Sequence, residues 1–145
     1  MAVQTPILYP SFKKTGHDGT FDLDNCTLRF HLLTSGYTYS SAHDELADVS
    51  AFVVTTTGYN GPVSKVLTAA NWESVNDTRY LNILSTAVFT ATNPLTAKYV
   101  VCYLSTGANP LMFCCDLQGS GSVLTATAPG QFVVSFPGNR MLLFP

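Results

Sequence analysis

The sequence predicts an all-β domain, an antiparallel β-sandwich, and three observations support this fold class. Proline and glycine interrupt the chain at short intervals with no tandem repeat, a rhythm typical of sandwiches and barrels. The 18 Thr and 12 Ser suit solvent-facing strand positions better than helices. The 145 residues, 46% of them hydrophobic, are enough for a single domain with one substantial core.

The first half of the chain predicts an arm, a strand and a helix. Residues 1–18 lack hydrophobic periodicity and contain Pro6 and Pro10, so we expect an extended N-terminal arm before a domain at 19–145. Segment 27–33, TLRFHLL, alternates and predicts a half-buried strand. Segment 40–50, SSAHDELADVS, predicts the one short helix, with Ser41 as its cap and Asp44 three residues later.

Further strands are predicted by apolar or alternating runs between turn residues. They lie at 51–57, 63–67, 80–84, 87–91, 97–104, 110–117, 123–128, 131–136 and 140–145. The run 97–104, AKYVVCYL, is apolar on both faces and predicts a strand in the middle of the sandwich. Eight to ten short strands imply two packed antiparallel sheets, most simply a jelly roll or a related sandwich.

The charge pattern narrows the classes of partner. Only 11% of residues are charged, and the net charge of -2 with scattered Lys and Arg argues against nucleic-acid binding. No apolar run is long enough to span a bilayer, and the basic pair of MAVQTPILYPSFKK follows its apolar part, the reverse of a secretory signal. We therefore expect synthesis in the cytoplasm, and a surface partly covered by a partner.

The polar residues offer little chemistry. His43, Asp44, Glu45 and Asp48 form the densest cluster; Asp44 and Asp48 would share a helix face, either as a divalent-metal site or as a solvated surface, and we favour the latter. Asp22–Asn25 resembles a calcium loop without its distal glutamate, so a turn is favoured. We expect no metal, no cofactor and no enzymatic activity.

The four cysteines are predicted to be reduced thiols that pack as small hydrophobic side chains. Cys26, Cys102, Cys114 and Cys115 lack metal-ligand spacing and a nucleophile motif. The adjacent pair Cys114–Cys115 should point to opposite faces of its strand.

Aromatic residues in the loops allow two interpretations. Tyr37, Tyr39, Tyr59 and Trp72 either form a stacking surface for a sugar or a protein, or close the ends of the sandwich.

Four segments resemble one family of bacteriophage proteins. They are FDLDNCTLRFHLLTSGYTYSSAHDELADVS at 21–50, TTGYNG at 56–61, AKYVVCYLSTGANPLMFCCDLQGS at 97–120, and GQFVVSFPGNRMLLFP at the end. In this order they are similar to capsid cement, or decoration, proteins of tailed bacteriophages. The chain departs from that pattern in its longer N-terminal arm and in HDELADVS, where many members carry paired phenylalanines.

The resemblance implies a jelly-roll protein that binds the outside of an icosahedral capsid in the virion and bridges subunits of the major capsid protein, often as a homodimer. It implies that the Asp22–Leu23–Asp24 turn, the strand end Leu32–Leu33–Thr34–Ser35, Tyr37 and the Gly58–Tyr59 turn are framework. No catalytic residue is carried over. The alternatives are a carbohydrate- or host-binding module, a tail or connector component and, least favoured, an enzyme using His43, Asp44 or Cys102.

We predict that partner contacts come from the arm, the aromatic loops and the C-terminal strand, because arms extend over neighbours at low cost. The residues are Pro6, Ile7, Leu8, Tyr9, Phe12, Tyr37, Tyr39, Tyr59, Leu142, Leu143 and Phe144. The alternative for the arm is that it packs on its own domain.

Overall fold

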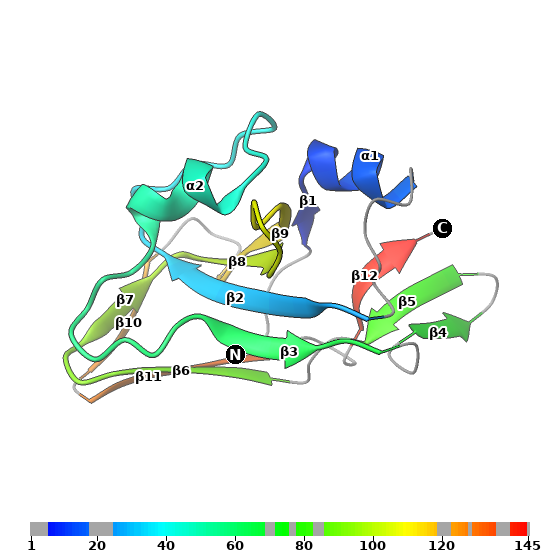
Figure 1. Ribbon diagram of the computed structural model, residues 1–145. Coiled ribbons are helices and arrows are strands. Elements are labelled where there is room, and N and C mark those ends of the chain that lie inside the picture. The colour runs from blue at the N-terminus through cyan, green and yellow to red at the C-terminus, as the bar shows by residue number, and fades with distance from the viewer. Residues whose placement is uncertain are drawn as a thin grey trace.

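The protein is mostly β, with antiparallel sheets and two short helices (Figure 1). The computed structural model describes residues 6–17, 25–68, 72–75, 78–82, 86–118, 123–127, 129–135 and 140–144. The side chains of residues 15–17, 72–75, 78–82, 130 and 140–144 lie outside that description. The elements are β1 Ile7–Leu8, α1 Pro10–His17, β2 Thr27–Leu33, α2 Leu46–Val49, a 3-10 turn Ser50–Phe52, β3 Val63–Val66, β4 Trp72–Val75, β5 Thr78–Asn82, β6 Thr86–Ala91, β7 Leu95–Ala97, β8 Tyr99–Leu104, β9 Leu111–Asp116, β10 Leu124–Ala126, β11 Gly130–Ser135 and β12 Arg140–Phe144.

The described strands form one large sheet and three small ones. The large sheet has the order β1-β9-β8-β2-β3, and the small ones are β10-β7, β11-β6 and β12-β5-β4. As its apolar sequence predicted, β8 lies inside the large sheet, between β2 and β9, and five of its six residues are buried. The alternation predicted for 27–33 is also confirmed, because Leu28, Phe30 and Leu32 are fully buried on one face of β2.

Two clusters of buried side chains lie on opposite faces of the large sheet. The larger joins Phe30 and its neighbours on β2 to Phe89 of β6 and Phe132 of β11, between the large sheet and the β6–β11 pair. The smaller joins Val101 and Tyr103 of β8 to residues of the helix side, such as Val49 of α2. Cys114 belongs to the smaller cluster and Cys115 to the larger, so the pair does point to opposite faces.

Three local predictions were wrong. The arm is not extended over its whole length, because Ile7 and Leu8 pair with β9 and residues from Pro10 onwards form helix α1. Proline fits the first turn of a helix, where its missing N–H has no intrahelical acceptor to lose. Segment 51–57 is not a strand either; it begins with the 3-10 turn and only Val53 bridges Leu33.

The third correction concerns the start of the predicted helix. Its cap is Glu45 and not Ser41, and α2 is a single turn. Asp48 forms a capping box with Glu45, and its Oδ2 accepts hydrogen bonds from the backbone N–H groups of Asp44 and Glu45, at 2.8 and 3.1 Å. Asp44 therefore lies before the helix and does not share a helical face with Asp48.

Candidate partner-binding surface

The N-terminal segment packs on its own domain. The Tyr9 N–H donates to the Met112 carbonyl at 3.1 Å, continuing the pairing of β1 with β9, and the side chains of Tyr9 and Phe12 are buried. Pro6 and Leu8 are half-buried. Of the five residues predicted here as partner contacts, Ile7 alone is exposed, at 43%. The burial of Tyr9 and Phe12 corrects their assignment to an accessible surface.

Tyr37 is a third predicted contact residue that is buried. Its hydroxyl lies 2.6 Å from that of Tyr9 and 3.3 Å from Nδ1 of His43. Its ring meets those of Phe52 and Tyr99 edge to face. Burial raises the pKa of Tyr37 to about 12, so the hydroxyl keeps its proton at neutral pH and joins the loop after β2 to the N-terminal segment.

Tyr39 is half-buried beside this pair. Its hydroxyl donates to the Leu8 carbonyl at 3.3 Å, and its ring centroid is 5.4 Å from that of Tyr9. Burial also raises the pKa of Tyr39. Tyr39 therefore packs against the N-terminal segment of its own chain.

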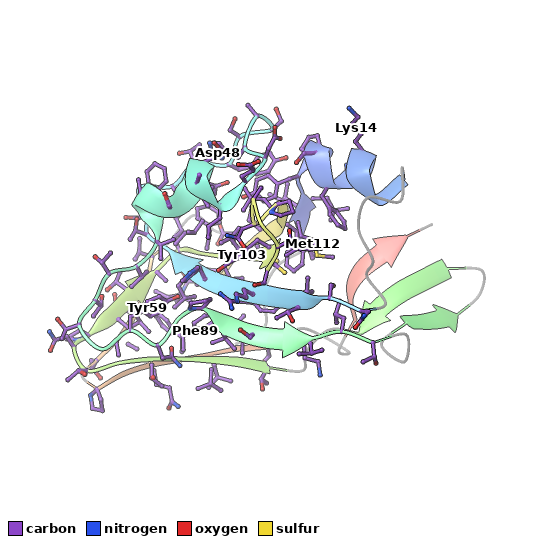
Figure 2. The ribbon with its side chains drawn as sticks, viewed as in Figure 1. Lys14, Asp48, Tyr59, Phe89, Tyr103 and Met112 are labelled. Carbon is purple, nitrogen blue, oxygen red and sulfur yellow. The ribbon has the colours of Figure 1, made fainter. Side chains whose placement is uncertain are left out.

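Tyr59 joins the large sheet to β6. Its hydroxyl accepts a hydrogen bond from the Leu32 N–H at 2.8 Å, and its ring stacks on Phe89 with centroids 6.2 Å apart. Figure 2 shows the two labelled rings side by side between the large sheet and the β6–β11 pair. Burial raises the pKa of Tyr59, so this hydroxyl too is protonated at neutral pH.

His31 lies between two aromatic rings on β2. The His31 ring centroid is 5.9 Å from that of Tyr103 and 6.0 Å from that of Tyr59. The Tyr59 hydroxyl lies 3.3 Å from Nδ1 of His31. Burial, together with the nearby Arg29 guanidinium, lowers the pKa of His31 to about 4. The imidazole is therefore neutral at neutral pH and packs between the two tyrosine rings.

The cysteines behave as packed side chains. Cys102, Cys114 and Cys115 are buried free thiols, and Cys26 is a partly buried one. Burial raises the pKa of Cys114 to about 11 and raises that of Cys102 and Cys115 as well. Each of these three thiols is therefore protonated at neutral pH, the form that is a poor nucleophile.

The acidic cluster contains one carboxylate with a defined structural role. The backbone N–H groups of Asp44 and Glu45 that bond Asp48 lower the pKa of its carboxyl group. Within the described ranges, no three His, Cys, Asp or Glu side chains are grouped so that they could hold a metal ion. Nor does this part of the chain contain a helix long and apolar enough to cross a bilayer.

Several predicted positions lie outside the description. They include the turn at 22–24 and the side chains of Trp72, Leu142, Leu143 and Phe144. The backbone of β12 is described and pairs with β5, Leu142 with Leu81 and Phe144 with Arg79. The C-terminal strand is thus part of a sheet of its own chain.

The structure also exposes apolar residues that our sequence prediction missed. Val88 of β6 and Val133 of β11 are paired across the strands and each is 40% exposed, whereas Phe89 and Val134 beside them point into the core. The sequence contains the pattern that indicates this exposure. In TAVFTA and QFVVS, alternation places the two valines on the face of each strand that points away from the inward-facing residues.

Comparison of the chain with protein-family models, with curated proteins and with solved structures gave no match. What the geometry does provide is an account of the sequence motifs. The strand end at Leu33 and Thr34 is fixed by backbone hydrogen bonds: the Leu33 carbonyl accepts from Lys98 and the Thr34 N–H donates to Phe52. The segments at 21–50 and 97–120 therefore meet where β2 ends and β8 begins.

Proposed function

We propose that this protein is a structural component of a tailed-bacteriophage virion that decorates and cements the outer surface of the icosahedral capsid. In this role it bridges neighbouring subunits of the major capsid protein, as a homodimer, and performs no chemical reaction. The proposal includes the finer fold assignment, a jelly roll, of which the mostly β, antiparallel architecture is the coarser form.

The observation that carries the proposal is that motif residues distant in sequence interlock as a framework. Tyr59 of the TTGYNG segment accepts the hydrogen bond of Leu32 in the HLLTS segment. Lys98 of the AKYVVCYL segment donates its N–H to the carbonyl of Leu33. A family whose shared motifs are structural predicts this arrangement, in which the motif residues hold strands together rather than surround a substrate.

The burial of the polar side chains in the motifs agrees with the same role. Tyr37 and Tyr59 are protonated hydroxyls engaged inside the chain, and Cys102 is a buried thiol. Their rings and polar atoms contribute to the stability of one domain. A stable domain that adds contact area across subunit joints is what cementing a shell requires.

Cementing does not need a strong individual contact. A capsid offers many equivalent sites, and a dimer that occupies two of them gains effective concentration at the second. Only 11% of the residues in the chain are charged. This composition suits contacts that depend on shape and burial more than on ion pairs.

The number of copies in purified virions tests the proposal. Quantitative mass spectrometry of this chain relative to the major capsid protein should give a ratio near one, or a simple fraction of it. A handful of copies per particle would contradict cementing and favour a tail or connector component, or a host-binding module. Absence from the particle would remove the virion role altogether.

A further inference from the structure

We propose that the outer face of the β6–β11 pair is the surface that docks on the capsid, against an uncharged, apolar-centred patch of the shell-forming protein. This inference rests on the proposed function and adds to it the face that makes the contact. The face consists of Thr86, Val88, Thr90, Gln131, Val133 and Ser135, called here the valine face.

The register of the two strands places an apolar pair at the centre of this face. Val88 and Val133 are directly opposite each other, and both are 40% exposed. Outward-facing residues at opposite positions of adjacent strands have Cβ atoms about 5 Å apart, so the two side chains form one continuous apolar spot. Hydroxyl and amide side chains surround it, and none of the six residues is charged.

The edge of β6 beside this face is closed, which determines how a partner can bind. The Asn60 side chain donates to the Val88 carbonyl at 3.2 Å and accepts from the Thr90 N–H at 2.8 Å. The Asn60 N–H also donates to the Thr90 carbonyl. A partner therefore cannot extend the sheet along this part of β6, and the outward-facing side chains are the surface that β6 offers.

The chemistry and size of the face indicate the kind of partner. Without charges it offers no ion pair to a phosphate backbone or an acidic peptide. Two strands of six residues cover on the order of 200 Å², from a length of about 20 Å and a width of about 10 Å. A stable free complex buries about 800 Å² per partner, so this face alone is too small to hold a dimer in solution.

A contact of this size is nevertheless sufficient to hold the protein on a capsid shell, where equivalent sites are repeated. Each docking event on a shell is repeated at equivalent sites, and a protein attached at more than one point is retained by contacts that would be weak singly. This is why we assign the valine face to the capsid protein rather than to a second copy of this chain.

Substitutions at the two valines test the assignment. The binding of purified full-length protein to capsid shells assembled without it is measured by co-sedimentation over a range of concentrations. Val88→Asp and Val133→Asp each place an unpaired charge in the contact and should weaken binding by about tenfold or more. Val88→Thr keeps the β-branched shape and should weaken binding by a smaller factor, without the risk that a charge disturbs the sheet.

A matched control is available on another strand. Val66 of β3 is 61% exposed and lies outside the valine face, so Val66→Asp makes the same chemical change there and should leave binding unchanged. Thermal unfolding of every variant verifies that it is folded. If a charged variant does not fold, Val88→Thr decides the outcome.

The possible outcomes separate the two proposals. If wild type binds shells and the valine-face variants bind equally well, the valine face is not the docking surface and the cement role stands. If wild type is a dimer that Val88→Asp dissociates, the occupant is a second copy and our assignment is overturned. If wild type does not bind shells at all, the cement role fails and the docking assignment fails with it.

Discussion

Tyr59 shows how a single side chain completes a sheet. Strand β3 pairs with β2 only as far as Phe30, opposite Val63. Beyond that point β3 provides no hydrogen-bond partner for the backbone of Leu32. The Leu32 N–H donates to the Tyr59 hydroxyl, and the Leu32 carbonyl accepts from the Val54 N–H. The buried backbone of β2 is thereby satisfied past the end of its neighbour.

We predict that Tyr59→Phe destabilises the protein because it leaves the Leu32 N–H without an acceptor. The loss of an acceptor to a buried donor costs about 1–3 kcal/mol, which urea unfolding would detect as a lower midpoint at unchanged slope. Tyr39→Phe is the control, since it removes a longer hydrogen bond, 3.3 Å to the Leu8 carbonyl, from a half-buried ring. Equal losses in the two variants would contradict the role assigned to Tyr59.

His31 makes stability depend on pH in a defined window. Its pKa in the folded chain is about 4, below the ordinary value of 6.5. Above pH 6.5 the ring is neutral in both the folded and the unfolded chain. As the pH falls from 6.5 towards 4, the unfolded chain binds a proton that the folded chain does not, so the free energy of unfolding falls.

The experiment is urea unfolding of wild type and His31→Gln at several pH values between 7 and 4. Wild type should lose stability through this range, and the variant should lose less. Asp48 contributes little above about pH 5, because its pKa is lowered from 3.8 and most of its own loss of stability falls below that value. His43→Gln is the control, because it replaces a histidine that lies on a loop. If the dependence of the free energy of unfolding on pH disappears in this variant and persists in His31→Gln, the effect comes from His43 and the prediction for His31 is wrong.

At the scale of elements, the turn after the 3-10 segment depends on one glycine. Gly58 has φ of +77°, in the left-handed region, and an added Cβ would lie 2.8 Å from the backbone N of Thr92 and still nearer to its Oγ1. The same Thr92 N–H donates to the Thr57 carbonyl at 2.9 Å, which joins this turn to the end of β6. Glycine is required here by both conformation and space.

Gly58→Ala should therefore lower the free energy of unfolding by more than about 1 kcal/mol, since it adds left-handed strain to a clash with backbone. Gly107→Ala is a matched control, because a Cβ at Gly107 meets nothing within 4 Å. Thermal unfolding of the two variants should show a clear decrease for the first and little change or a small increase for the second. A turn that tolerates both equally would contradict the tight contact with Thr92.

The elements that were predicted correctly from sequence are those whose signal is local. Alternation in TLRFHLL and the apolar run YVVCYL reflect period and burial within a few residues, so β2 and β8 were predictable. Helix α1 was missed because Pro10 was taken as a breaker, although the first turn accepts proline. The start of α2 was misplaced because serine is a preferred N-cap residue and glutamate is not, whereas the hydrogen bonds of Asp48 place the cap at Glu45.

The candidate contact residues were less predictable, because burial of a side chain in a loop depends on distant partners. Tyr9 and Tyr37 are separated by 28 positions and bury each other's hydroxyls. No pattern within either segment indicates this pairing. The exposed pair Val88 and Val133 was readable in principle from alternation, but only the strand register shows that the two valines are adjacent.

At the scale of the whole molecule, the large sheet carries a core on each face and so leaves few places for a partner. Helix α2 and the loop after β2 cover one face, and β6 and β11 cover the other (Figure 1). Residues such as Tyr9 and Tyr37, which looked like contacts in the sequence, are part of these covers. Under the proposed function, contacts with a capsid are then expected on the outside of the covering elements, which is where the valine face lies.

If the chain cements a capsid, particles without it should open more readily than complete ones. DNA-filled particles that lack the protein should release their genome at a lower temperature, because the pressure of the packaged DNA is opposed by fewer contacts across subunit joints. Release is measured by the fluorescence of a DNA-binding dye during heating.

Adding purified wild-type protein back should restore the release temperature, and adding Val88→Asp should restore it only partly at the same concentration. Complete and deficient particles that open at the same temperature would show that the protein decorates the shell without strengthening it.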